Sequence, residues 1–370
     1  MKIALYNLTT TTKSGGIETF NWEMAKALAK RGHTVHIYGG KDRFLYDNPS
    51  GIPVYTFPYI RRERFPDFGT RFRRFMERLS FGFFANQDLI KGHYDYVYLI
   101  KPYDIPLALF VSLRSKARII FGSSGTEFFP GYTQLVQKVH HFFACSEFNA
   151  SQIERYCGIR PVVLHNGVDT HHFKPISPDP VLRRALNLSD RDIVIMTVGR
   201  LVGLKGVKYA IGAVEKMVKK GYAVKYFAIG EGEERGNLEM LVKNSHMEDH
   251  IFFLGNIPNA AVPGYYSLAS LAVFPTVAEE SFGISLAEAM ACGVPCVSTT
   301  RGAIPEVIGD AGYLVPPENE EALADALETL ITDGVLRDRL RTEGRRRIEE
   351  GFSWDRITRE FEEYLSRDSV

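Results

Sequence analysis

Two glutamates, Glu280 and Glu288, stand eight residues apart around the start of a predicted helix. They follow an apolar, strand-like run at residues 271–274, and Gly283 separates that run from helix-forming residues that stop at Gly293. A helix N-terminus beyond the carboxyl end of a parallel strand offers free N–H groups and a partial positive charge to a phosphate. A carboxylate inside the helix accepts two hydrogen bonds, which suits the vicinal diol of a ribose. We therefore interpret the element as half of a nucleotide site, in preference to two solvated glutamates favoured by the helix dipole.

Two cations follow another strand-like run, residues 193–198, in a loop that ends where a second helix is predicted. Arg200 presents a planar fork of donors that fits phosphate oxygens, and Lys205 acts as a point charge. Gly199 and Gly206 flank the two cations and allow the backbone to turn sharply. Two cations at a strand end can stabilise a departing diphosphate without a metal ion. We expect neither a metal nor any other cofactor.

Short turns end several other strand-like runs. Gly230 and Ile257 each follow such a run in the C-terminal half of the chain. Gly15 and Gly16 precede the first predicted helix, residues 17–30, where paired glycines allow a phosphate or a sugar to approach closely. The dinucleotide pattern G-x-G-x-x-G is missing from this first strand–helix turn, which argues against an oxidoreductase.

Together these segments resemble the retaining group 1 glycosyltransferases of family 4. Residues 280–288 match the E-x7-E signature of that family, residues 199–206 its G-R-x4-K-G motif, residues 15–18 its G-G-x-E opening and residues 166–169 its N-G-V-D marker. The resemblance implies that Glu280, Arg200 and Lys205 act in catalysis. The donor-binding residues that it implies are Gly15, Gly16, Arg200, Lys205, Gly230, Ile257, Glu280, Ser281, Phe282, Gly283, Ile284 and Glu288.

The chain departs from the family at one place. Many members carry a histidine after the strand that corresponds to residues 118–122, where this chain reads Ser-Ser-Gly-Thr-Glu. Ser124 takes the place of that histidine, and we assign Ser124 and Glu127 to the acceptor side of the site. His140 and His141 follow in a predicted helix and are interpreted as structural.

Strand-like runs alternate with helical patterns along the whole chain, which favours an α/β fold with parallel sheets covered by helices. The resemblance implies the GT-B fold, two facing Rossmann-like domains with an interdomain cleft. We expect an N-terminal acceptor-side domain at 1–170 and a C-terminal nucleotide-sugar-binding domain at 171–350. An amphipathic helix within 351–370 is expected to cross back to the first domain.

The composition excludes several classes of protein. A net charge of +1 over 370 residues does not suit a nucleic-acid-binding protein. None of the four cysteines has C-x-x-C spacing, and Cys292 and Cys296 are expected to be buried free thiols. No apolar run approaches the roughly 20 residues that cross a bilayer. We expect a cytoplasmic protein, free or peripheral at the inner face of the membrane.

The segment 61–84 is basic and aromatic. Its apolar residues Phe68, Phe72, Phe75 and Leu79 fall on one face of a predicted helix, and four arginines are placed on the other side, namely Arg71, Arg73, Arg74 and Arg78. Such a helix suits an anionic membrane surface. A helix whose apolar face packs on the N-terminal sheet would show the same pattern.

The expected activity is retaining transfer of a hexose-type sugar from a nucleotide diphosphate sugar to an acceptor hydroxyl. A glycan or a lipid-linked molecule would be the acceptor, and no side chain singled out above distinguishes uridine from guanosine. Two alternatives remain at this point. A sugar-nucleotide epimerase could share the fold, and a non-catalytic nucleotide-sugar-binding protein could share the donor site.

Overall fold

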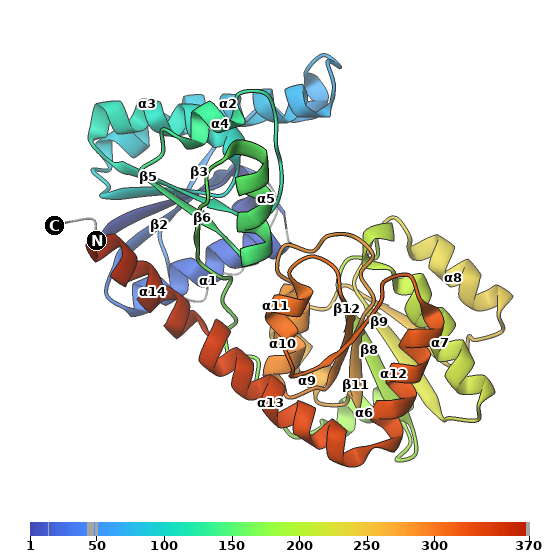
Figure 1. The fold of residues 1–370 in the computed structure, drawn as a ribbon. Coiled ribbons are helices and arrows are strands. Elements are labelled where there is room, and N and C mark those ends of the chain that lie inside the picture. Colours follow the sequence, from blue (N-terminus) through green and yellow to red (C-terminus); the bar gives the residue numbers. More distant parts are fainter. Residues whose placement is uncertain (14, 43–47, 49–50, 368–370) are drawn as a thin grey trace. The chain divides into compact units, whose positions relative to one another are not determined.

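The computed structural model describes residues 1–13, 15–42, 48 and 51–367, which form two compact units. The first unit consists of Met1–Gly167 together with the helix that begins at Trp354, and the second consists of Val168–Ser353. Each unit contains one parallel sheet with helices on both faces (Figure 1). No helix among the described residues is long and apolar enough to cross a membrane.

The first unit is built on a seven-stranded sheet in the order β3-β2-β1-β4-β5-β6-β7. Along β1, alternate side chains turn to opposite faces, so that Ile3 and Leu5 join one core cluster and Ala4 and Tyr6 join another. The strands are β1 (Lys2–Tyr6), β2 (Thr34–Gly40), β3 (Val54–Phe57), β4 (Tyr96–Leu99), β5 (Arg118–Ser123), β6 (His141–Ala144) and β7 (Val162–Val163).

Helices cover both faces of this sheet. The helices α1 (Gly16–Lys30) and α14 (Trp354–Arg367) lie on one face, where Trp354, Ile357 and Phe361 complete the core (Figure 1). On the other face lie α2 and α3, with α4 and α5 beside β5 and β6. Their bounds are α2 (Thr70–Lys91), α3 (Ile105–Ser115), α4 (Tyr132–Val136) and α5 (Glu147–Cys157).

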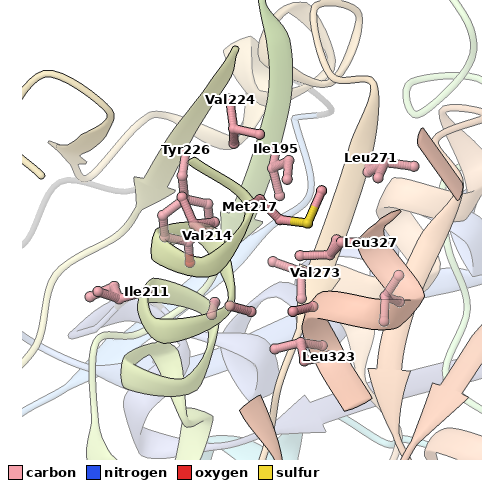
Figure 2. Packing of buried hydrophobic residues seen from close by; sticks show 14 of the residues in the cluster. Ile195, Ile211, Val214, Met217, Val224, Tyr226, Leu271, Val273, Leu323 and Leu327 are labelled. Carbon is pink, nitrogen blue, oxygen red and sulfur yellow. The ribbon is translucent and has the colours of Figure 1, made fainter. Parts of the chain in front are cut away.

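The second unit repeats the same plan with a six-stranded parallel sheet in the order β10-β9-β8-β11-β12-β13. One face packs against α7 and α12, and Figure 2 shows Val214, Met217 and Leu327 meeting the strands there. The strands are β8 (Ile193–Val198), β9 (Val224–Ile229), β10 (Ile251–Gly255), β11 (Leu271–Phe274), β12 (Cys296–Thr299) and β13 (Tyr313–Val315). The helices are α6 (Pro180–Ala185), α7 (Val207–Lys219), α8 (Arg235–Asn244), α9 (Val262–Tyr266), α10 (Ile284–Ala291), α11 (Ile304–Ile308), α12 (Glu320–Thr332) and α13 (Gly334–Phe352).

The strand-like runs at 118–122, 193–198 and 271–274 are confirmed as β5, β8 and β11, whereas β3 and β13 have weak sequence signals. β3 is an edge strand with two exposed central residues, and β13 has only three residues, so neither shows a clear apolar pattern. The predicted helix at His140 and His141 is wrong. His141 is the buried first residue of β6 and pairs with Ile120 of β5, because the phenylalanines after it favour a strand. The prediction of buried free thiols at Cys292 and Cys296 is confirmed.

Candidate active site

The strand order of the second sheet changes direction between β8 and β11, and this point brings the two predicted halves of the site together. The loop after β8 carries Arg200 and Lys205, and the loop after β11 carries Glu280 and leads into α10. In parallel α/β sheets, ligands bind beyond the carboxyl ends of the strands at such a switch point.

Lys205 and Glu280 are directly paired, because the ammonium of Lys205 donates to the carboxylate of Glu280. Both side chains are partly exposed, at 32% and 24%. Arg200, five residues before Lys205, is exposed and forms no ion pair within the described part of the chain. Two cations and one carboxylate thus occupy the switch point, where an incoming diphosphate would meet an excess of positive charge.

The backbone fixes the two loops to each other. The carbonyl of Leu204 accepts a hydrogen bond from the amide of Val277 at 3.0 Å and another from the hydroxyl of Thr276 at 3.0 Å. Gly206 has a φ of +66°, and a Cβ there would overlap the carbonyl of Pro275. The carbonyl of Glu280 in turn accepts from the amide of Ala303, after β12, at 2.8 Å. The loops after β8, β11 and β12 therefore form one rigid edge.

The N-terminus of α10 follows directly from this edge. Gly283, the residue before the helix, has a φ of +94°, a conformation that favours glycine, and no side chain caps the helix there. Phe282 is 2% exposed and its ring packs 5.6 Å from Phe352, so only its backbone can face a ligand. Ser281 and Ile284, on either side, are partly exposed.

Glu288 lies on the second turn of α10 and is buried, at 7% exposed. Burial, and after it the charge of Glu288, raises the pKa of the Tyr266 hydroxyl well above its ordinary value. Tyr266 donates to the carbonyl of Ser285 at 3.1 Å, which anchors the first turn of the helix. A nearly buried carboxylate on a helix fixed in this way suits binding of two adjacent hydroxyls.

The ends of β9 and β10 continue the same edge of the sheet. Gly230 has a φ of +136° and packs so closely on Gly199 that a Cβ would overlap its carbonyl. The amide of Gly230 also donates to the carbonyl of Gly255 at 2.8 Å. Gly230 is therefore brought beside the loop of Arg200, and Ile257 follows two residues after β10, partly exposed.

In the first unit, Gly15 and Gly16 lie at the start of α1, beyond the carboxyl end of β1. Glu18 of α1 accepts a hydrogen bond from the hydroxyl of Thr9, and a Cβ on Gly15 would crowd its carboxylate. The loop after β1 is thus tied to the helix N-terminus.

A buried ion pair lies at the switch point of the first sheet, between β1 and β4. Arg78 of α2 donates to both carboxylate oxygens of Asp104, at 2.8 and 2.7 Å, and to Asn7, after β1, at 2.7 Å. The interpretation of Arg78 as a residue of the polar helix face is wrong, because α2 buries Arg78 and Phe81 against the sheet. Burial raises the pKa of the Asp104 carboxyl, and the charge of Arg78 opposes that rise. In the sequence, the only local indication of this ion pair is that an aspartate, Asp104, comes soon after the strand that ends at Leu99.

The two residues assigned to the acceptor side follow β5. Ser124 comes directly after the last residue of that strand and is partly exposed. Glu127 accepts a hydrogen bond from Lys101, after β4, at 2.7 Å, and lies 3.9 Å from Arg74 of α2. Within the described residues, no group of three or more histidine, cysteine, aspartate or glutamate side chains could hold a metal ion.

The chain is similar to known glycosyltransferases. The family described as "Glycosyl transferases group 1" matches residues 179–347, and "Glycosyltransferase Family 4" matches residues 14–172. The chain is 26% identical to an uncharacterized glycosyltransferase of Methanocaldococcus jannaschii, over 94% of this chain and 93% of that protein.

Two further similarities are narrower in what they show. The N-acetyl-alpha-D-glucosaminyl L-malate synthase of Bacillus anthracis is 33% identical, but over only 49% of this chain and 47% of that enzyme. The structure of Anabaena HepE in complex with UDP and glucose superposes with a TM-score of 0.80 and 21% identity, covering 99% of each chain. The latter match shows the fold.

These matches confirm the α/β class, the two parallel sheets and the GT-B fold predicted from the sequence. The chain belongs to the group 1, family 4 glycosyltransferases, enzymes that transfer a sugar from a nucleotide-sugar donor.

Proposed function

We propose that this enzyme transfers a hexose from a nucleotide diphosphate sugar to an acceptor hydroxyl with retention of the anomeric configuration. The observation that carries the proposal is the pairing of Lys205 with Glu280 at the switch point of the second sheet, beside Arg200 and the N-terminus of α10. A UDP-sugar is the first donor to test, because HepE, which has the same fold, binds UDP and glucose. The acceptor is a lipid-linked molecule or a cell-surface glycan.

The reaction needs stabilisation of negative charge on the leaving diphosphate. Fixed positive charge comes from Arg200, Lys205 and the amide groups at the start of α10, where negative charge develops on the diphosphate. The acceptor hydroxyl attacks the anomeric carbon on the face from which the diphosphate departs, and a phosphate oxygen takes the hydroxyl proton. No side-chain nucleophile is required, and Glu280 orients Lys205 and the donor sugar.

We also propose that no divalent metal takes part, because Arg200, Lys205 and the N-terminus of α10 already supply positive charge to the diphosphate. The experiment that tests the whole function supplies a panel of UDP-, GDP- and ADP-sugars, with and without EDTA, and measures free nucleotide. Release of nucleotide that EDTA does not suppress supports the proposal. Conversion of the donor sugar without nucleotide release would identify an epimerase, and binding without turnover would identify a non-catalytic protein.

Replacement of Glu288 by Gln should weaken donor binding about 10–100-fold, because a charge-assisted hydrogen bond contributes roughly 1.5–3 kcal/mol. Calorimetric titration with the productive nucleotide sugar measures the loss. The 2′,3′-dideoxy nucleotide provides the control, since it has no ribose diol to bind and should show no difference between the two proteins. Equal affinity of both proteins for the complete donor would remove Glu288 from the ribose site.

We further propose that the enzyme works in the cytoplasm, at the inner face of an anionic membrane, through the segment 61–84. Beside the buried face of α2, large apolar side chains remain in contact with solvent, with Phe68 at 75% and Phe83 at 76% exposed. The helix thus packs on the sheet, while Phe83 within it and Phe68 just before it are exposed, as are Arg71 and Arg74 near its start.

The double replacement of Phe68 and Phe83 by Ser should reduce sedimentation with phosphatidylglycerol vesicles by at least about tenfold, since burying one such side chain contributes roughly 1.5–3 kcal/mol. Val335→Ser serves as the control, because Val335 is 85% exposed in the second unit. Unchanged vesicle binding in the double variant would reject this surface.

A further inference from the structure

Where β4 ends beside the start of α2, positive side chains outnumber negative ones, and none of these positive side chains belongs to the donor site described above. Three cations gather there: Lys101 after β4, and Arg71 and Arg74 in the first turns of α2. Glu127 is the carboxylate that faces them, since it accepts from Lys101 at 2.7 Å and lies 3.9 Å from Arg74. Arg78 and Asp104 lie beside them but neutralise each other.

These groups share one neighbourhood around Tyr103. Burial raises the pKa of the Tyr103 hydroxyl, and the negative charge of Glu127 raises it further. The positive charges of Arg71, Arg74 and Arg78 act to lower the same pKa. Tyr103 itself is 6% exposed and its ring stacks on Phe129 at 4.9 Å. The loop after β5, which carries Glu127 and Phe129, is therefore held against the buried ring of Tyr103.

The stability of α2 does not account for these arginines. Arg71 lies in the first turn of α2, where a cation opposes the helix dipole, and that turn contains no acidic residue. The side chain of Arg74 is 47% exposed, and Arg71 is exposed and forms no ion pair among the described residues. The neighbouring Arg73 differs from them, because it donates to the carbonyl of Phe65 at 3.1 Å and forms an ion pair with Asp67 at 3.4 Å.

We propose that the acceptor carries a phosphate group, which Arg71, Arg74 and Lys101 bind at this edge. The inference rests on the proposed function, because it names the chemistry of the molecule that receives the sugar. An excess of two positive charges matches a phosphate monoester, and guanidinium groups bind phosphate oxygens through paired hydrogen bonds. Glu127 holds Lys101 and Arg74 at this edge, and the phosphate displaces it from them in part.

The test uses the full chain saturated with UDP, so that the diphosphate site is already filled. Glycerol 3-phosphate and glycerol are titrated calorimetrically as soluble probes, and phosphatidylcholine vesicles with and without phosphatidic acid serve as the lipid source. Binding should occur to the phosphorylated probe of at least one pair and not to its neutral partner. The double variant Arg71→Gln, Arg74→Gln should weaken that binding at least about tenfold, because it removes the charge-assisted hydrogen bonds of both guanidinium groups to the phosphate.

The double variant Lys116→Gln, Lys138→Gln removes the same charge from exposed positions of the first unit outside the segment 61–84, and it should retain binding within about threefold, as expected for screened surface charges. Dependence on Arg71 and Arg74 with the soluble probe identifies a free phosphate acceptor, and dependence with vesicles alone identifies a phospholipid-type acceptor. The proposal is overturned if neither phosphorylated probe binds, or if the two double variants behave alike. Failure of the proposed function appears separately, as a protein that binds no nucleotide sugar.

Discussion

Lys205→Ala should lower the rate of sugar transfer by about 10²–10³-fold, the loss seen when one preorganised donor to a developing anion is removed. Lys205 lies at the switch point of the second sheet, paired with Glu280, on a loop whose backbone is fixed to the loop after β11. Removal of the ammonium leaves the leaving diphosphate with Arg200 and the helix N-terminus alone. Because charge on the leaving group grows toward the transition state, the loss should fall mainly on kcat and less on KM.

Steady-state kinetics with the productive donor measure this effect. Lys208→Ala is the matched control, since Lys208 is an exposed lysine three residues further on whose ammonium lies 4.9 Å from the Tyr209 ring. Lys205→Arg keeps the charge and should recover part of kcat. If Lys205→Ala were no slower than Lys208→Ala, the diphosphate would have to bind elsewhere.

Asp104→Ala should destabilise the first unit by about 3–5 kcal/mol, because it leaves the buried guanidinium of Arg78 without its counter-charge. The pair is almost fully enclosed, with side-chain exposures of 7% for Arg78 and 0% for Asp104. Asn7 would remain as a neutral acceptor for one arm of the guanidinium. For a unit of this size, such a loss lowers the melting temperature by roughly 6–20 °C.

Scanning calorimetry resolves the transition of the first unit, and donor binding reports separately that the second unit stays folded. The double variant Asp104→Ala, Arg78→Met should recover much of the lost stability, because replacement of both buried partners by apolar groups is often close to neutral. If the double variant lost as much stability as the single variants Asp104→Ala and Arg78→Met added together, the ion pair would not be the source of the effect.

The sequence predicted the second unit well for a physical reason. Its strands are apolar runs, and three of them, β8, β9 and β10, end at or just before a glycine. Most residues assigned to the donor site follow the strand ends along the chain, so that local pattern and spatial position coincide. Lys205 and Glu280 could be placed at one edge because parallel strands share their carboxyl ends. Their direct pairing required the strand order, which places β8 beside β11.

The contacts of the first unit were harder to predict from the sequence, because the most important of them join distant parts of the chain. In the sequence, Arg78 falls on the polar face of a predicted helix. It contacts Asp104 because β4 and the turn after it place Asp104 beside α2. A hydrophobic periodicity cannot separate a buried, paired arginine from a solvated one. Lys101 and Arg74, which are distant in the sequence, likewise come together through Glu127 of the loop after β5.

The position of α14 has a consequence for the order in which the protein matures during synthesis. The core of the first unit includes Trp354, Ile357, Phe361 and Leu365, which the ribosome makes only after the whole of Val168–Ser353. Domains usually fold as units in the order in which they emerge, N-terminal first. Here the first unit emerges without one side of its core, so the second unit is the first to have all of its residues outside the ribosome. Until α14 follows, Phe20 and Tyr98, which pack against that helix, present apolar surface that chaperones recognise.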